Sequence, residues 1–156
     1  MFKKILVTID GSEYSKQILP TALEVARKFE GEVFVLHVAE HDRGRAAVYS
    51  TETPSEATQL VADAVKLFRD AGLTAKGAVH DVAAGHVAKD IVESAESDGA
   101  DLIVMGSRGL SDVQGLFLGS VTHKVMQLTR LPVLVARGGA AVKAEQPALA
   151  HAAAAV

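Results

Sequence analysis

Ala100-Asp101-Leu102-Ile103-Val104-Met105-Gly106-Ser107-Arg108-Gly109 is followed by nine residues and then by Gly119-Ser120-Val121. The apolar run that ends at Met105 is typical of a buried parallel strand, and the segment 121–129 has the pattern of a helix. We therefore predict a strand, a glycine loop and a helix, with Ser120 as the helix N-cap. The first N–H groups of a helix lack partners within it, and the helix dipole is positive at that end, so the start of this helix suits an anion.

The glycines in this stretch have two interpretations. They can form a phosphate cradle, or they can serve only to end a strand and begin a helix. The stretch is not a Walker motif, because no Gly-Lys-Ser/Thr follows, and it is not a Gly-x-Gly-x-x-Gly fingerprint after the first strand. On this stretch alone, the two interpretations are equally supported.

The composition excludes several classes of protein. The chain has 156 residues, of which 49% are hydrophobic, enough for one domain with a proper core. A net charge of −3 gives no broad basic surface for nucleic acid, and the absence of cysteine excludes disulfides and thiolate metal sites. No apolar run approaches the ~20 residues that span a bilayer, and Met1-Phe2-Lys3-Lys4 leads directly into a strand without a cleavable signal. We expect a cytoplasmic protein without nucleic-acid or membrane partners.

Strands and helices alternate along the chain. Apolar runs predict strands at 5–9, 32–39, 73–79, 101–105 and 131–136, and periodic patterns predict helices between them. The expected helices begin at Ser12 or Ser15, at Pro54, near Val87 and at Val121, and the first three end at Gly31, Gly72 and Gly99. This alternation predicts an α/β fold, an open five-stranded parallel sheet with helices on both faces. The domain spans 1–137, and the alanine-rich tail over 138–156 is expected to be disordered.

Some details of these elements are also predicted. The helix from Pro54 should turn a set of apolar residues to the core: Leu60, Val61, Ala64, Val65, Leu67 and Phe68. The segment 81–85 is expected to be a turn, and the less apolar strand before it is expected at a sheet edge. Parallel sheets bind ligands at the carboxyl ends of their strands, where the strand order reverses. Asp10 closes the first strand and Gly106 the fourth, so these residues face one crevice if the two strands are neighbours.

With Asp10 at one end and Gly106-x2-Gly109-x9-Gly119-Ser120 at the other, the chain resembles the universal stress protein family. The resemblance covers about residues 2–137 and includes the opening Lys-Lys-Ile-Leu-Val-Thr-Ile-Asp-Gly-Ser-Glu and the closing Pro132-Val133-Leu134-Val135. It implies a Rossmann-like three-layer α/β/α fold with strand order 3-2-1-4-5. It also implies membership of the ATP-binding subgroup and a homodimer built on the last strand, Pro132 to Ala136.

The resemblance implies a division of the site into an adenosine end and a phosphate end. At the adenosine end, Asp10 would meet the base or ribose, Val38 would offer its backbone to adenine, and Thr8 and Met105 would line the pocket walls. At the implied phosphate end, Gly106, Arg108 and Gly109 would line the ribose and phosphates. Phosphate would be held by Gly119, Ser120 and Val121. The ligand is ATP, and whether Mg²⁺ accompanies it is left open.

Three functions are compatible with these residues. The first is an ATP-binding stress-response switch, the second a slow ATP hydrolase, and the third a dimeric interaction module that binds no nucleotide. The intact glycine pattern argues against the third function, and the lack of an evident general base argues against the second. His37 is expected to pack in the core or a pocket wall, and His80, Asp81 and His86 match no metal motif. A protein partner of the switch cannot be named from the sequence.

Overall fold

Strands and helices alternate in the computed structural model, which describes residues 1–41, 52–107 and 118–137. The elements are β1 (Lys4–Ile9), α1 (Glu13–Phe29), β2 (Glu32–His41), α2 (Pro54–Asp70), β3 (Ala75–Ala83), α3 (Val87–Asp98), β4 (Leu102–Gly106), α4 (Ser120–Leu128) and β5 (Val133–Ala136). The tail over 138–156, which we expected to be disordered, lies outside the described residues.

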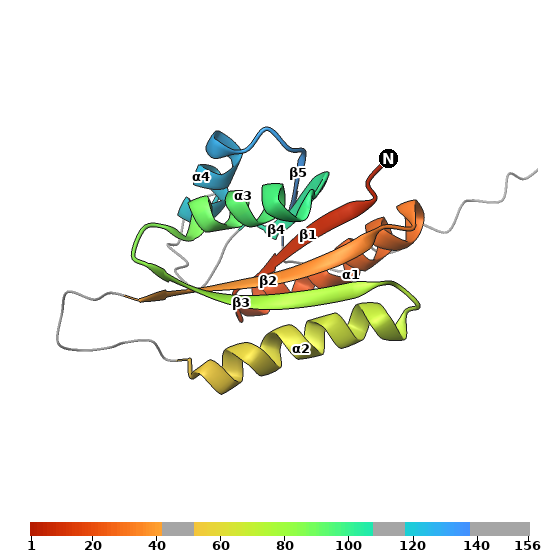
Figure 1. The fold of residues 1–156 in the computed structure, drawn as a ribbon, viewed down its shortest axis with the longest axis horizontal. Coiled ribbons are helices and arrows are strands. Elements are labelled where there is room, and N and C mark those ends of the chain that lie inside the picture. Colours follow the sequence, from red (N-terminus) through yellow and green to blue (C-terminus); the bar gives the residue numbers. More distant parts are fainter. Residues whose placement is uncertain (42–51, 108–117, 138–156) are drawn as a thin grey trace, which may run out of the picture.

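The strands form one parallel sheet with the order β3-β2-β1-β4-β5. Helices α1 and α2 pack on one face and α3 and α4 on the other, which gives three layers (Figure 1). The predicted fold class and strand order are therefore confirmed. The weakly apolar third strand is at an edge, as expected.

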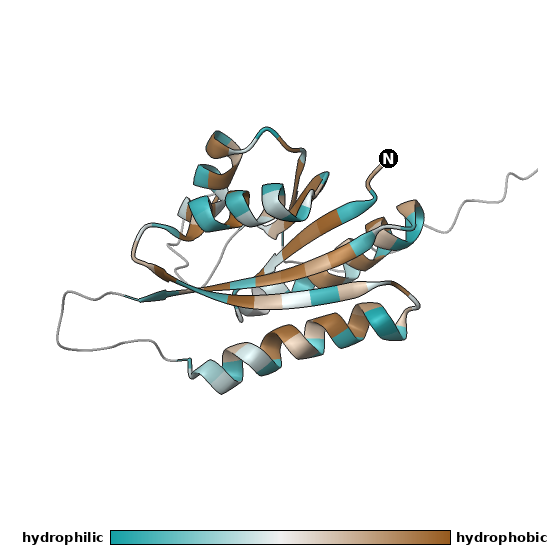
Figure 2. Cartoon of the chain, viewed as in Figure 1, coloured by the Kyte–Doolittle hydropathy of each residue, from teal (hydrophilic) through white to brown (hydrophobic). Residues whose placement is uncertain are grey.

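The central strand β1 is buried on both faces. Ile5, Val7 and Ile9 contact the cluster formed with α1 and α2, and Leu6 belongs to the cluster formed with α3 and α4. Alternate residues of a strand point to opposite faces, so a strand covered on both sides needs an almost continuous apolar run. Figure 2 shows this run as brown strands between helices whose outer faces are teal.

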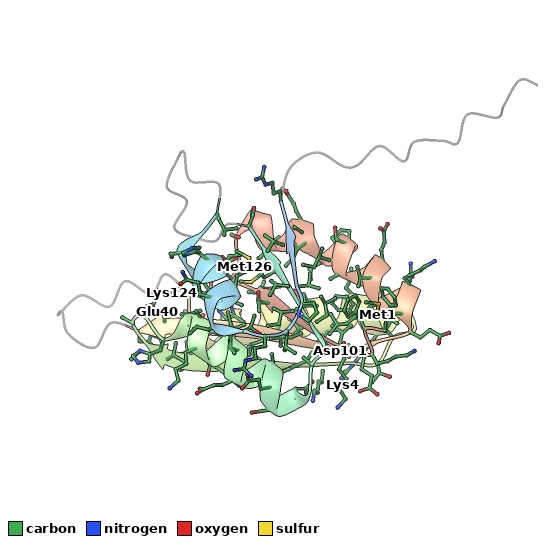
Figure 3. All side chains as sticks on the ribbon, turned by 90° about the horizontal axis from the view of Figure 1, so that it is seen from above. Met1, Lys4, Glu40, Asp101, Lys124 and Met126 are labelled. Carbon is green, nitrogen blue, oxygen red and sulfur yellow. The ribbon has the colours of Figure 1, made fainter. Side chains whose placement is uncertain are left out.

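The amino-terminal end of the sheet is fastened by one carboxylate. Asp101 accepts hydrogen bonds from the backbone N–H of Lys3 at 2.8 Å and of Lys4 at 3.2 Å. Figure 3 shows Lys4 and Asp101 together at this end, whereas Glu40 and Lys124 lie at the opposite end. The carboxyl ends of the strands, where the sequence predicts the site, therefore lie at the Glu40 end.

Two predicted element ends are wrong. The segment 81–83 belongs to β3 and pairs with Ala39, Glu40 and His41 of a longer β2, so the turn expected over 81–85 begins only after Ala83. Polar residues in these strand ends hide the pairing from the hydrophobic pattern. The left-handed residue that ends α1 is Glu30, with φ 51°, and not Gly31. A Cβ on Gly31 would lie 2.8 Å from the Phe2 carbonyl oxygen, so this glycine serves a close approach of two chain segments.

One predicted core residue of α2 is also wrong. Ala57, Val61, Ala64, Val65 and Phe68 are buried, and Leu60 packs against them, but Leu67 is 40% exposed. Consecutive helical residues are separated by about 100° around the axis, so the neighbour of a fully buried Phe68 turns away from the sheet. In the described residues, no helix is long and apolar enough to cross a membrane.

Close packing between α2 and β3 leads to a test of stability. A Cβ on Gly77 would lie 2.4 Å from Val61 Cγ1 and 2.8 Å from Val65 Cγ2. We expect Gly77→Ala to lower the free energy of unfolding by about 1–3 kcal/mol, because overpacking forces α2 away from the sheet. Urea unfolding measures the effect. In a double-mutant cycle, Val61→Ala should relieve part of the loss, and strictly additive effects would contradict this contact.

Candidate functional site

The carboxyl ends of β1, β2 and β4 lie next to one another. Ile9 pairs with His37 of β2, and Val7 pairs with Val104 of β4. Extending these parallel registers places Asp10 level with Val38 on one side and with Ser107 on the other. It also places Thr8 beside Met105, on the face covered by α3 and α4. The structure thus brings all four predicted adenosine-end residues to the carboxyl end of the sheet.

The carboxylate of Asp10 is held by the turn that begins α1. Its Oδ1 accepts hydrogen bonds from the backbone N–H of Ser12 at 3.0 Å and from the Ser12 hydroxyl at 2.6 Å. Ser12 is also the N-cap of α1, because its Oγ accepts from the N–H of Ser15 at 3.1 Å. Gly11, between Asp10 and Ser12, has φ +79°, a conformation that residues with a side chain rarely adopt. The position of Asp10 is therefore fixed by the start of α1 on one side and the end of β1 on the other.

The first residues of helix α4 lie beside the carboxyl end of β4 in space. The N–H of Gly119 donates to the Ser107 carbonyl at 2.7 Å, and the Thr122 hydroxyl donates to the Gly106 carbonyl at 2.8 Å. Thr122 is 4% exposed, and the N–H of Ser107 in turn donates to the Ala136 carbonyl of β5 at 2.9 Å. These bonds bring the predicted phosphate-end residues Gly106 and Gly119 together.

The N-cap of α4 is Gly119, and the prediction that Ser120 caps the helix is wrong. Gly119 has φ −68° and ψ 153° and makes no side-chain cap, whereas Ser120 is the first helical residue. The bond from Gly119 to Ser107 holds Gly119 in the extended conformation that an N-cap requires. Gly119 has no side chain to cap the first N–H groups of the helix, which favours an anion there. Arg108 and Gly109 lie outside the described residues.

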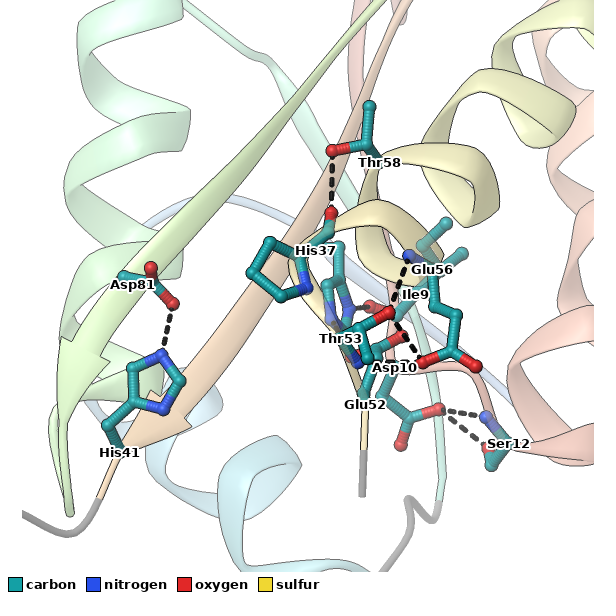
Figure 4. Close-up of polar contacts among 11 residues, drawn as sticks. Ile9, Asp10, Ser12, His37, His41, Glu52, Thr53, Glu56, Thr58 and Asp81 are labelled. Atoms are coloured by element: carbon teal, nitrogen blue, oxygen red, sulfur yellow. Dashed lines mark hydrogen bonds and ion pairs between the residues drawn. The ribbon is translucent and has the colours of Figure 1, made fainter. Parts of the chain in front are cut away.

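His37 is buried in β2 on the face covered by α1 and α2 and is 2% exposed. Its Nδ1 lies 2.9 Å from the Ile9 carbonyl oxygen, and its Nε2 lies 2.7 Å from Oε2 of Glu52 (Figure 4). The expectation of a packed histidine is confirmed in its location, but the ring also joins two chain segments.

Histidine–carboxylate pairs also occur elsewhere at this end of the sheet. His41 Nε2 lies 2.6 Å from Asp81 Oδ1, and His80 Nδ1 lies 2.8 Å from Asp90 Oδ2. In the parts of the chain that the structure describes, no group of three or more such residues is placed to hold a metal ion. Ser94 Oγ is 3.5 Å from the His80 nitrogen that already faces Asp90, so these three residues do not form a nucleophilic triad.

Three contributors to the site were missed by the sequence interpretation. Ser12 was considered only as a helix cap, Thr122 was not considered, and Glu52 was included only in a long polar connection. A threonine two residues after the predicted N-cap Ser120 carries a weak local signal. No local signal connects Glu52 to His37, because fifteen positions separate them and the contact depends on the packing of α2.

These features define a Rossmann-like three-layer α/β protein with a candidate ligand site at the reversal of strand order. A family model described as the universal stress protein family matches residues 1–137, so the chain belongs to that family. It is 35% identical to the universal stress protein YxiE of Bacillus subtilis, over 88% of this chain and 100% of that protein.

Solved structures of relatives have the same fold. The structure of MJ0577, a Methanocaldococcus jannaschii universal stress protein, superimposes with a TM-score of 0.69 at 29% identity, covering 90% of this chain and 99% of that one. A universal stress protein from Archaeoglobus fulgidus, solved in complex with dAMP, gives a TM-score of 0.64 at 25% identity, covering 86% and 97% of the two chains.

The N-terminus of α2, which follows Glu52, leads to a test of pH dependence. Thr53 and Glu56 form a capping box, in which the Thr53 N–H and hydroxyl donate to the Glu56 carboxylate at 2.7 and 2.8 Å. Both hydrogen bonds lower the pKa of Glu56 below 4.5, and the bond from the Thr53 backbone has a larger effect than the bond from the Thr53 hydroxyl. Because the folded pKa is depressed, this stabilisation is present above about pH 4.5 and is lost as the pH falls through the folded value.

We therefore expect Glu56→Ala to lower the free energy of unfolding near neutral pH and to have progressively less effect as the pH falls towards about 3. Urea unfolding of both proteins across this range measures the difference. Glu93→Ala, on the exposed side of α3, is a control for loss of a surface carboxylate. A difference for Glu56→Ala that is constant with pH would contradict the capping role of its carboxylate.

Proposed function

We propose that the protein binds ATP at the carboxyl ends of β1 and β4 and acts as a nucleotide-dependent regulator of a stress response. The observation that carries this proposal is the start of α4. Its N-cap is a bare glycine, and the Gly119–Ser107 bond fastens that glycine to the end of β4, next to β1 and the Asp10 that follows it. The first N–H donors of a helix have no partner within it, and together with the helix dipole they suit phosphate.

The charges support one orientation of the ligand. The Asp10 carboxylate suits the hydroxyl groups of a ribose and would repel bare phosphates, whereas the N-terminus of α4 attracts them. We place the adenosine between Asp10 and the backbone of Val38, with Thr8 and Met105 as pocket walls. The phosphates would lie against Gly106, Gly119, Ser120 and Val121, with Arg108 and Gly109 added from the family motif. The relative solved with dAMP supports an adenine nucleotide in a site of this fold.

ATP is proposed as a bound ligand with little turnover. Hydrolysis requires a group that directs water at the last phosphate, and the Asp10 carboxylate lies at the other end of the proposed ligand and is bonded to Ser12. A ligand that binds only the folded state stabilises it by RT ln(1 + [L]/Kd), so ATP would favour one state of the protein for a partner to recognise. If Mg²⁺ accompanies ATP, it would enter bound to the phosphates and would keep several of its waters.

Calorimetry with ATP tests this function. We expect a micromolar-scale Kd for the intact chain, equivalent to about −8 kcal/mol, and an ATP-dependent rise in melting temperature. Gly119→Val should abolish binding, because its side chain would stand over the first N–H groups of α4. The φ of −68° at this position is accessible to valine, so the fold should be retained, as circular dichroism can show.

A matched control separates the phosphate contact from the cost of altering a helix N-cap. His86 is the N-cap of α3, and it also makes no side-chain cap. His86→Val should leave the Kd for ATP unchanged. Absence of heat and of a melting shift at millimolar ATP in the wild type would reject the function, and normal binding by folded Gly119→Val would reject the location.

We also propose that the protein is a homodimer in which two β5 strands pair across a two-fold axis. β5 is the outermost strand of the described sheet, and an unpaired edge is an aggregation hazard. The carbonyls of Pro132 and Ala136 accept from Ile103 of β4 and from Ser107 directly after it, so by alternation the N–H groups of Val133 and Val135 point to the other edge. Met126 and Leu128 of α4 are 41% and 55% exposed and supply further apolar surface.

Light scattering at micromolar concentration tests the dimer. We expect twice the chain mass for the wild type and a monomer for Val135→Pro, because proline removes an outward N–H and keeps the bonds to β4. Val135→Thr, which retains that N–H and a β-branched side chain, should stay dimeric. A monomeric wild type, or a dimeric and folded Val135→Pro, would contradict pairing through β5.

A further inference from the structure

We propose that His37 and Glu52 are positioning residues for the adenosine end of the nucleotide site, which they serve by holding the backbone on both sides of Asp10. The inference rests on the proposed nucleotide site. It assigns a function to a buried histidine–carboxylate pair and makes the N-terminus of α2 part of the support of the site.

The hydrogen bonds of the His37 ring determine how the two segments are joined. Nδ1 faces the Ile9 carbonyl, which can only accept, so Nδ1 carries a proton and donates it across 2.9 Å. Nε2 and the Glu52 carboxylate are 2.7 Å apart, a distance that requires a proton between them. The His37 side chain is 3% exposed and that of Glu52 28%, so water competes little for these bonds. The ring is thus a rigid link between the end of β1 and Glu52.

This link contacts both neighbours of Asp10. His37 binds the carbonyl of Ile9, the residue before Asp10. The other carboxylate oxygen of Glu52 lies 3.7 Å from the position that a Cβ on Gly11 would occupy, directly after Asp10. Figure 4 shows Asp10, Glu52 and Ser12 side by side at the end of β1. The pair therefore holds the backbone before Asp10 and borders the turn after it, while Ser12 fixes the direction of the carboxylate.

Glu52 is itself fixed by α2. It precedes Thr53, the N-cap of α2, whose capping box with Glu56 sets the direction of the chain at that point. Leu60 of the same helix lies 3.5 Å from the Cβ position of Gly11. A continuous set of contacts thus runs from the start of α2 through Glu52 and His37 to Ile9. Displacement of the α2 N-terminus would release the turn that carries Asp10.

Affinity measurements with AMP and ATP test the positioning. Glu52→Ala should weaken both ligands by the same factor, about tenfold or about 1.4 kcal/mol, because both contain the adenosine that Asp10 meets. Glu52→Gln can still hydrogen-bond Nε2 and should restore affinity to within about threefold. Gly119→Val should weaken ATP more than AMP, because it acts at the phosphate end.

His41→Gln is the matched control. It disrupts a histidine–carboxylate pair on the same strand, but His41 and Asp81 are 43% and 67% exposed, and their mutual bond lies between β2 and β3. This variant should bind AMP and ATP as the wild type does. A loss equal to that of Glu52→Ala would overturn the inference, because it would show a general weakening of this end of the sheet.

Nuclear magnetic resonance supplies a readout in the free protein. The Nδ1 proton of His37 and the proton between Nε2 and Glu52 should be protected from exchange with water in the wild type, and the second should lose this protection in Glu52→Ala. Unprotected ring protons in the wild type would overturn the link, and unchanged AMP affinity in folded Glu52→Ala would overturn the positioning. A wild type that binds neither AMP nor ATP would instead reject the proposed function, and the protection measurement would still report on the link.

Discussion

The pairing of β1 with β2 on one side and with β4 on the other is the constraint on which the rest of the structure depends. Because β1 is central, it needs an apolar run on both faces, which α1 and α2 cover on one side and α3 and α4 on the other. The chain leaves β1 towards β2 and β3 and later returns to β4 on the opposite side. The connections therefore diverge above the end of β1, and Asp10 and the start of α4 meet at that divergence.

Most of the fold could be predicted because burial imposes patterns that are local in sequence. Five apolar runs indicated the strands, and Pro54 and Gly99 marked helix ends by their preference for the first turn and for the residue after the last turn. The predictions failed where pairing does not depend on burial. Glu40, His41 and Asp81 extend β2 and β3 with polar side chains, and Leu67 lies just outside the buried stripe of its helix. Neither feature leaves a clear hydrophobic signal.

The candidate site was predicted less completely than the fold, because its support comes from contacts distant in sequence. The residues proposed for the adenosine end lie at strand ends. They were predicted by matching this sequence to the family motif position by position. The helix cap was assigned to Ser120 on the preference of serine, whereas the bond between Gly119 and Ser107 selects the glycine. The bonds of Thr122 to Gly106 and of Glu52 to His37 required three-dimensional packing to be seen.

A largely buried polar pair such as His37 and Glu52 is not expected to add much to the stability of the fold by itself. Burial removes the His37 ring and most of the Glu52 side chain from water, and their mutual attraction often does no more than offset that loss, so a well-packed apolar pair is commonly as stable. The surrounding residues Val35, Val61 and Ile9 show that this face of the sheet is packed by aliphatic side chains. A hydrogen-bonded link differs from such packing in direction, since it fixes the Ile9 carbonyl at a set distance and angle. The proposed site requires directional support beside Asp10, because a shift of the backbone there would change where the carboxylate meets the proposed ligand.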